Sequence, residues 1–312
     1  MNWEYQILAA FVLDLMVGDP GWLPHPVRVI GRFASFLEGP LRRLAAPRTA
    51  GNLTAVAVIG TTALAAGALI YAAGLLHPLA KDAVSVFLLY TAFAAKDLAD
   101  HSGRVFNALR SGDIEEARRQ VSRMVGRDTQ SLDEAGVARA AVESVAENTV
   151  DGMIAPLFFA AVAGPVGAMV YKAVNTLDST FGYRNERYAE FGWASARIDD
   201  LANYIPARLA VPLIALAAAV TGMRTGEAFR MARRDGRRHP SPNSGWSEAA
   251  FAGALGVRLG GPVLRKGKPE TMPYLGDAAE ALEIEHIGRA NRLMIAASLL
   301  AVVVFASARV IF

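Results

Sequence analysis

The chain has 312 residues, of which 53% are hydrophobic and 20% charged, and its mean hydropathy is +0.27. This composition is too apolar for a soluble domain of that length and is typical of an integral membrane protein. The absence of cysteine excludes disulfides, thiolate metal sites and cysteine nucleophiles, and the net charge of +3 comes from arginines in loops between apolar runs, which indicates membrane topology rather than a nucleic-acid surface.

Six apolar segments follow one another along the chain. Residues 5–17 come after a start that lacks a basic region and a cleavage site, so we expect this segment to be retained as a membrane segment. Residues 53–76 are the clearest span, because a helix of this length rises about 1.5 Å per residue and can cross about 30 Å of hydrocarbon. The remaining apolar segments are residues 83–95, 152–171, 209–223 and 293–308.

The basic residues favour one orientation of these segments. If all six cross the membrane, 25 of the 32 Lys and Arg residues fall on one side, which predicts cytoplasmic large loops. We therefore predict an all-α integral membrane protein with about four to six membrane segments and helical cytoplasmic loops. It would form one polytopic domain over residues 1–312, located in the bacterial inner membrane.

One loop argues against six crossings. Residues 172–208 are dense in polar groups and would lie on the opposite side from the other large loops. We favour the alternative in which residues 152–171 and 209–223 are re-entrant or buried in protein. Helix breakers in the first of these segments support it, since irregular backbone at membrane depth needs protein or water around it: Pro156, Gly164 and Pro165.

The polar segments between the apolar runs have helical patterns. "DIEEARRQVSRMVG" begins with Asp113 as an expected N-cap, and the helix after Ser131 is expected to begin with a capping box formed by Ser131 and Glu134. By contrast, we expect "DLMVGDPGWLPHPVRVIGR", residues 14–32, to be a rigid Pro-Gly loop that fixes His25. No strand pattern of useful length occurs.

Two polar clusters flank the apolar run 152–171. Before it, Arg139, Glu143, Glu147 and Asp151 recur every four residues, beside Ser144 and Asn148. An acidic stripe of this kind is usually a solvated helix face, but here it leads into an apolar segment, where ionised groups need a partner, a cation or water.

After the run, Lys172, Asn175 and Ser179 share a helical face bordered by Asp178, and Gly182 is expected to end that helix. Such groups suit phosphate and Mg²⁺, although a lysine that extends to the membrane surface is the simpler explanation for Lys172. Further along, Asp199, Asp200 and Asn203 lie within one turn, a weak pattern for a site that binds Mg²⁺ and phosphate.

Several blocks together resemble the CbiB/CobD family of cobalamin biosynthesis, adenosylcobinamide-phosphate synthase. The matching stretches are "DLMVGDPGWLPHPVRVIGR", "KDLADHS", "VGRDTQSLDEAGVARAAVESVAENTVDGMIAPLFF", "YKAVNTLDSTFGYRNERYAEFGWASARIDDLANYIPARL" and "HPSPNSGWSEAAFAGALGVRLGG". They cover about half the chain and lie in the order found in the family.

The resemblance implies an integral membrane ligase that joins the free propionate of adenosylcobyric acid to (R)-1-aminopropan-2-ol or its O-phosphate, using ATP and Mg²⁺. Its expected partners are these two small molecules and membrane lipid, with possible association with other membrane enzymes of the corrin pathway. The main alternative is a transporter or permease, because polar groups at broken membrane helices also mark solute paths.

Charge type and placement suggest roles for individual residues in such a reaction. Proton transfer is expected from Glu143, Glu147, Asp151 and His25, with His239 in reserve. Phosphate and propionate binding is expected from Lys172, Arg184, Arg197, Arg127, Lys96, Asn148, Asn175 and Ser179. Mg²⁺ binding is expected from Asp178, Asp199, Asp200 and Asn203. In this hypothesis both polar clusters face a single cavity at the membrane edge.

Overall fold

The computed structural model describes the backbone of residues 1–183 and 185–311. It describes the side chains of the same residues up to residue 307. The chain divides into two compact units, each assembled from segments that are discontinuous in sequence. The first contains residues 1–94, 155–203 and 302–312, and the second contains residues 95–154 and 204–301. The expectation of one polytopic domain stays a prediction.

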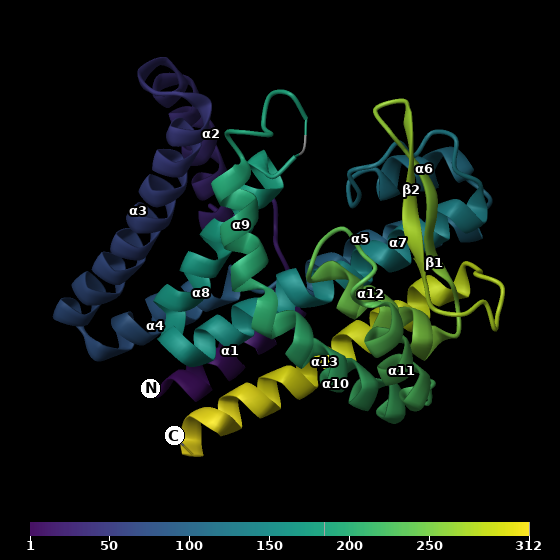
Figure 1. The fold of residues 1–312 in the computed structure, drawn as a ribbon. Coiled ribbons are helices and arrows are strands. Elements are labelled where there is room, and N and C mark those ends of the chain that lie inside the picture. Colours follow the sequence, from purple (N-terminus) through teal and green to yellow (C-terminus); the bar gives the residue numbers. More distant parts are fainter. Residues whose placement is uncertain (184, 312) are drawn as a thin grey trace. The chain divides into compact units, whose positions relative to one another are not determined.

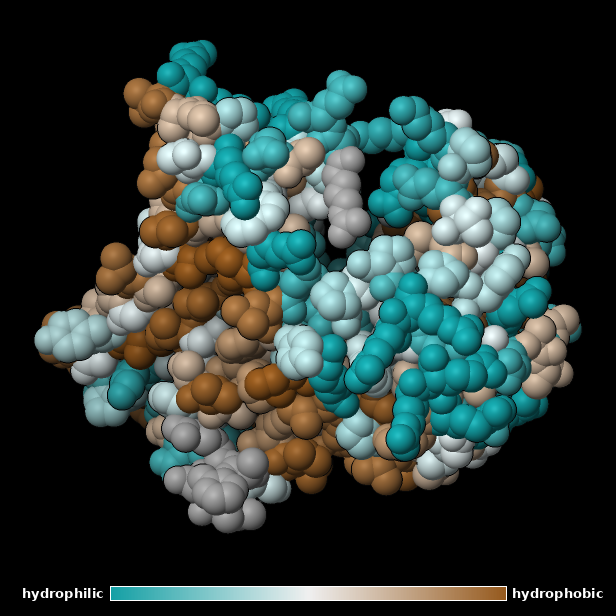
Figure 2. Space-filling view, viewed as in Figure 1, coloured by the Kyte–Doolittle hydropathy of each residue, from teal (hydrophilic) through white to brown (hydrophobic). Residues whose placement is uncertain are grey.

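In its described residues the first unit consists of helices and their connections, without strands (Figure 1). Its helices are α1 (Trp3–Val17), α2 (Pro26–Leu44), α3 (Pro47–Leu76), α4 (Pro78–Tyr90), α8 (Ala155–Phe181) and α9 (Trp193–Ala202), together with the end of α13 (Glu285–Ile311). Helix α3 packs against α2, α4 and α8, and α8 packs against α9. Figure 2 shows hydrophobic residues over the part of the molecule formed by α3, α8 and α9.

The second unit combines helices with a small antiparallel hairpin (Figure 1). Its elements are α5 (Ala95–Arg110), α6 (Ile114–Val121), α7 (Glu134–Thr149), a π-helical turn η1 (Val150–Ile154), α10 (Tyr204–Val220), α11 (Thr225–Asp235), α12 (Ser244–Leu255), β1 (Leu259–Arg265), β2 (Lys268–Leu275) and most of α13. Helix α12 packs against α7, α10 and α11.

The predicted fold class is confirmed. Among the described residues, four helical stretches are long and apolar enough to cross a membrane: Pro47–Leu76, Pro78–Arg110, Glu134–Phe181 and Glu285–Ser307. A fifth exists if the bent pair α9 and α10 forms one span. The clearest predicted span, residues 53–76, lies within α3, and only 28% of the most apolar part of that helix is buried in the protein.

Of the expected helix breakers in the run 152–171, Gly164 and Pro165 lie at an interruption of α8, whereas Pro156 lies in the first turn of that helix. Helix α8 is interrupted at Ala163 and Gly164, where Gly164 adopts a φ of 64° directly before Pro165. Such a left-handed residue is accessible to glycine because it has no Cβ. Whether this segment or residues 209–223 cross the membrane stays a prediction.

The structure corrects three local expectations. Helix α7 begins at Glu134 with Asp133 as its N-cap, not with a capping box at Ser131, because the Asp133 carboxylate accepts a hydrogen bond from the Gly136 N–H at 2.8 Å. The expected loop 14–32 is confined to residues 18–25, since Pro26 occupies the first turn of α2, where its missing N–H costs nothing. The caps of α6 at Asp113 and the end of α8 before Gly182 are confirmed.

The third correction is the hairpin, which the sequence pattern did not predict. Gly260 and Gly261 in β1 and Pro269 and Pro273 in β2 remove the usual signals of a strand. The hairpin turns at Lys266 and Gly267, both with positive φ. Its tip is held from outside, because the Asp128 carboxylate accepts hydrogen bonds from the N–H groups of both turn residues, at 3.1 and 2.6 Å.

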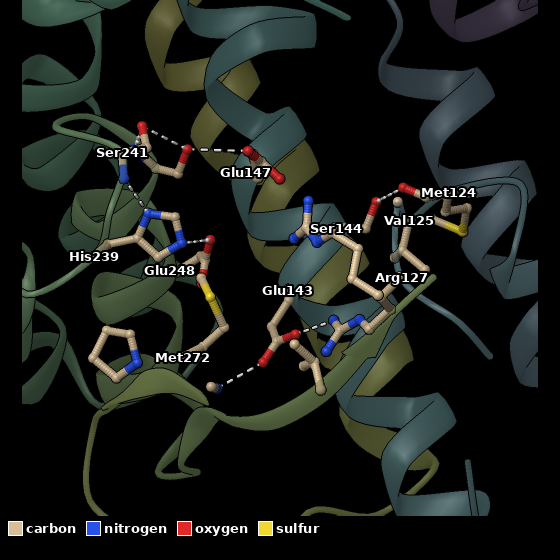
Figure 3. A pocket seen from close by; sticks show the side chains of 16 residues that line it. Met124, Val125, Arg127, Glu143, Ser144, Glu147, His239, Ser241, Glu248 and Met272 are labelled. Atoms are coloured by element: carbon tan, nitrogen blue, oxygen red, sulfur yellow. Dashed lines mark hydrogen bonds and ion pairs between the residues drawn. The ribbon is translucent and has the colours of Figure 1, made fainter. Parts of the chain in front are cut away.

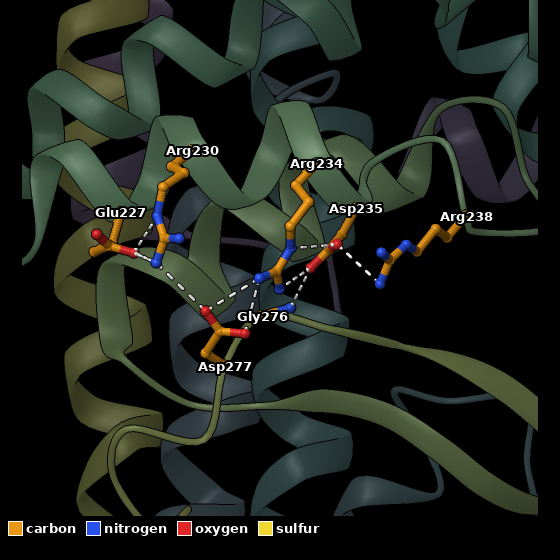
Figure 4. A network of polar contacts seen from close by, with 7 residues as sticks. All are labelled: Glu227, Arg230, Arg234, Asp235, Arg238, Gly276 and Asp277. Atoms are coloured by element: carbon orange, nitrogen blue, oxygen red, sulfur yellow. Dashed lines mark hydrogen bonds and ion pairs between the residues drawn. The ribbon is translucent and has the colours of Figure 1, made fainter.

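A buried carboxylate fixes the other end of the hairpin to α11 (Figure 4). Asp235 is fully buried and accepts hydrogen bonds from the Gly276 N–H at 2.8 Å and from Arg234 at 2.7 Å, with Arg238 at 3.0 Å. Although burial raises the pKa of Asp235, the hydrogen bonds from Arg234 and Gly276 outweigh it and lower that pKa below its usual value. Asp235 therefore stays ionised and links α11 to the end of β2.

Replacing Asp235 by alanine should lower the free energy of unfolding by about 3 kcal/mol, because the Gly276 N–H loses its buried acceptor and two arginines lose their partner. The matched control is Glu227→Ala, which removes a more exposed partner of Arg230 and should cost no more than about 1 kcal/mol. Thermal unfolding of the detergent-purified variants measures both. Equal losses would contradict the anchoring role of Asp235.

Replacing Gly51 by alanine should also destabilise the protein. A Cβ at Gly51 in α3 would overlap the backbone carbonyl of Phe191, and overpacking of this kind typically costs about 1–3 kcal/mol. Gly60→Ala in the same helix is the control, because a Cβ there meets nothing within 4 Å. The unfolding midpoint should fall for Gly51→Ala alone, and unchanged midpoints for both variants would disprove the close approach.

Candidate active site

A polar cavity of about 330 Å³ lies within the second unit (Figure 3). Its walls come from α7, the segment before α7, the segment before α12, α12 itself and the hairpin. Three carboxyl groups, three hydroxyl groups, two guanidinium groups and an imidazole line it: Glu143, Glu147, Glu248, Ser144, Ser241, Ser244, Arg127, Arg265 and His239. The sequence thus brings the acidic stripe of α7 to the His239 segment, about a hundred positions further along the chain.

Glu143 holds one wall of the cavity in place. It is only 8% exposed, and its carboxylate binds Arg127 with one oxygen and accepts a hydrogen bond from the Gly260 N–H at 2.7 Å with the other. Charge-assisted bonds of this kind offset the cost of burying an ionised group. Glu143 therefore joins α7 to the preceding segment and to β1, while its predicted role in proton transfer stays a prediction.

The opposite wall is a short network of hydroxyl groups at the beginning of α12. The Ser244 hydroxyl donates a hydrogen bond to Glu147 at 3.0 Å and lies 3.2 Å from the Ser241 hydroxyl. The backbone N–H of Ser241 donates to Nδ1 of His239 at 3.1 Å, so a neutral His239 carries its proton on Nε2. Glu147 itself is exposed, so its carboxylate is accessible from the cavity.

Glu248 and His239 face each other inside the cavity, with Nε2 of His239 3.8 Å from Oε1 of Glu248. Burial raises the pKa of Glu248 well above its ordinary value, and the nearby charges of Glu143 and Glu147 raise it further. Burial likewise lowers the pKa of His239. Both side chains therefore favour their neutral forms, and the cavity contains a carboxylic acid and an imidazole that can exchange protons with a bound molecule.

A second polar cluster lies within the first unit, where α8 meets α9. The Tyr171 hydroxyl donates to the side-chain oxygen of Asn203 at 2.9 Å, and the Asn203 amide donates to Asp199 at 3.0 Å. Asp178 and Asn175 also interact with Asp199. Four residues predicted from the sequence as ligands are therefore brought together, although Asp200 pairs instead with Arg197 at 3.5 Å.

The oxygen atoms of this cluster can be compared with the ligands that Mg²⁺ requires. Within residues 1–183 and 185–311 no group of three or more His, Asp or Glu side chains is placed to hold a metal ion. Mg²⁺ often needs only one or two carboxylates, because waters and substrate phosphates complete its coordination. The carboxylates of Asp178 and Asp199 with the Asn175 and Asn203 amides meet that requirement.

The other predicted residues lie in varied surroundings. Lys96 pairs with Asp100 at 2.6 Å, Ser179 donates to the Thr176 carbonyl at 3.0 Å, and His25 lies 3.9 Å from Asp19. Asn148 donates to the Ser144 carbonyl at 2.9 Å and Lys172 is half-buried in α8. Asp151 lies in the π-helical turn, which interrupts the four-residue repeat, and it does not line the cavity. Arg184 lies outside the described residues.

Four polar residues of the cavity were missed by the sequence analysis: Ser241, Ser244, Glu248 and Arg265. The first three lie in a block that resembles the family, yet only His239 was selected from it. Glu248 could have been found, because it is the single charged residue in the apolar stretch "WSEAAFAGAL" and an isolated acid in such a stretch needs an explanation. The serines could not have been found in this way, because they reach the cavity only through contacts between segments that are distant in the sequence.

Comparison with known proteins identifies the family of the chain. The family model described as CobD/Cbib protein matches residues 7–294. The chain is 52% identical to cobalamin biosynthesis protein CobD of Geobacter metallireducens over 96% of this chain and 95% of that protein, and 47% identical to the CobD protein of Pelobacter propionicus over 96% and 93%.

A relative with the other family name is similar over the same extent. Cobalamin biosynthesis protein CbiB of Salmonella typhi is 45% identical over 96% of this chain and 95% of its own length. No solved structure matches the chain. On the family model and these full-length relatives, the chain belongs to the CobD/CbiB family of cobalamin biosynthesis proteins.

Proposed function

We propose that this protein is a membrane ligase that forms an amide between the free propionate of adenosylcobyric acid and (R)-1-aminopropan-2-ol or its O-phosphate, with ATP and Mg²⁺, in the bacterial inner membrane. Membership of the family supports a role in cobalamin biosynthesis. The observation that carries the specific reaction is the cavity in which Glu147, His239 and Glu248 come together, because amide formation needs groups that accept protons from an amine.

The chemistry of the reaction defines what the protein must supply. The amine nitrogen forms the new C–N bond, the activated carboxyl group loses its phosphate-bearing oxygen, and the amine gives up its proton. ATP supplies the leaving group, since a free carboxylate is a poor acyl donor. The protein must bind the ammonium form of the amine, accept its protons and hold the carboxyl carbon within reach.

The cavity residues match the proton-accepting part of this task. Glu147 is accessible and is oriented by its hydrogen bond from Ser244. His239 carries its proton on the nitrogen that faces Glu248, but the 3.8 Å between them is too long for a hydrogen bond, so Glu147 is the group of this cavity that is placed to accept a proton. Arg127 and Glu143 fix the wall beside them.

The cluster of the first unit would hold Mg²⁺ through Asp178, Asp199 and Asn203, because these side chains provide the oxygen ligands that Mg²⁺ prefers. Lys172, half-buried on α8, belongs to the same unit and would neutralise phosphate charge there. These assignments retain the roles predicted from the sequence.

The reaction is tested by incubating the detergent-purified protein with adenosylcobyric acid, ATP, Mg²⁺ and either aminopropanol or its phosphate. Mass spectrometry of the corrinoid should show the mass gain of the amide, and omission of ATP should abolish it. With folded protein, the absence of a gain with either amine would disprove the ligase. Corrinoid flux into proteoliposomes without product formation would then support a transporter.

The raised pKa of Glu248 predicts a pH-dependent stability. A carboxyl group with a pKa raised in the folded state binds more protons there than in the unfolded chain, so stability is lost as the pH rises above the ordinary value of 4.5. Glu248→Gln cannot ionise and should avoid this loss. The difference between the unfolding midpoints of Glu248→Gln and the unmodified protein should therefore increase from pH 5 to pH 8.

His239 acts in the opposite direction, because its lowered pKa makes the protein lose stability as the pH falls below 6.5. Both proteins retain His239, so its contribution is common to both wherever Glu248 is uncharged. A midpoint difference that stays constant across the range would contradict a neutral Glu248.

A further inference from the structure

The cavity has room for the amine substrate. Its volume of about 330 Å³ is more than a molecule the size of an amino alcohol or its phosphate requires.

The charges of the cavity favour a cation. Glu143 is neutralised by Arg127, with which it forms an ion pair. Arg265, the other guanidinium on the wall, lies 3.3 Å from Glu270 outside the cavity. Of the remaining ionisable groups, Glu248 and His239 favour their neutral forms. The accessible carboxylate of Glu147 therefore supplies the negative charge of the cavity, and its walls carry no unpaired positive charge.

Glu248 presents its carboxyl group to the cavity. It is 7% exposed, and no hydrogen bond to this carboxyl group is found among the described residues; His239 lies at 3.8 Å. A ligand that donates a hydrogen bond can therefore bind to it. An ammonium group can donate three hydrogen bonds, whereas a phosphate would meet an acidic side chain here.

We propose that this cavity binds the ammonium group of the amine substrate, with Glu147 and Glu248 as its acceptors and the Ser241 and Ser244 hydroxyls beside its alcohol oxygen. The assignment rests on the proposed function, and it names the substrate and the residues that select it. Glu147 receives the ammonium first because it is accessible, and Glu248 holds it at the buried end.

The first test uses the unmodified full-length protein in detergent and titration calorimetry. 1-Aminopropan-2-ol should bind, and propane-1,2-diol, which has the same size but no ammonium group, should bind at least about tenfold more weakly, since hydrogen bonds to charged groups are among the strongest in proteins. Equal binding of the two compounds would overturn the proposal without relying on any variant.

The second test compares Glu147→Gln and Glu248→Gln with Glu134→Gln, an exposed residue at the start of the same helix as Glu147 that does not line the cavity. Both cavity variants should raise the Kd and the KM for the amine by about tenfold or more, with unchanged KM values for ATP and the corrinoid. Glu134→Gln should leave all three values unchanged. Thermal unfolding confirms that each variant is folded.

The outcomes separate this proposal from the proposed function. Ligation by the unmodified protein, with the same amine KM in folded cavity variants, would overturn the amine site and leave the ligase intact. Binding of the amine that is weakened in the variants, without any ligation, would support the site and disprove the ligase.

Discussion

The candidate site depends on one buried ion pair. Glu143 is nearly inaccessible to solvent, and both of its carboxylate oxygens are satisfied, one by Arg127 and one by the Gly260 backbone. Burying an ionised carboxylate without these partners would cost several kcal/mol. The three segments that supply the bonds must therefore stay together, and they form one wall of the cavity.

The same constraint explains why α7 is buried on nearly all sides. From Val137 to Ala146 the helix presents mostly alanine and valine, which allows close packing against α5, α6 and α12. Glu143 can face inward within this helix because its charge is compensated, and Glu147, one turn further, reaches the cavity. A helix that looks half solvated in the sequence is therefore a central packing element of the second unit.

The ionisable groups on the far side of the cavity are neutral, unlike the ion pair of Glu143 and Arg127. Glu248 and His239 lack a strong countercharge close by, so burial favours their neutral forms. In the hairpin anchor, by contrast, Asp235 stays ionised because arginines and a backbone N–H surround it. One unit thus contains a compensated acid that fixes structure and an uncompensated acid that is available to a ligand.

The first unit gathers its polar groups in a comparable way. Asp199 and Asn203 on α9 meet Tyr171 and Asp178 on α8. The chain must reverse its direction between α8 and α9 for this to happen, because Asp178 and Asp199 are 21 positions apart and Tyr171 and Asn203 are 32 positions apart. Sequence spacing identified the polar residues, and the packing of the two helices decided which of them share a site.

By itself the sequence determined the membrane-protein class, the clearest span in α3, the helix break at Gly164 and the family resemblance, because hydropathy, helix breakers and local motifs act over short distances. It also identified Glu143, Glu147 and His239 as polar residues of interest. Tertiary structure decided that these three share a cavity, that Ser244 and Glu248 complete it and that a hairpin rich in Gly and Pro closes one side. Those features arise from contacts between distant segments, whose geometry no local pattern specifies.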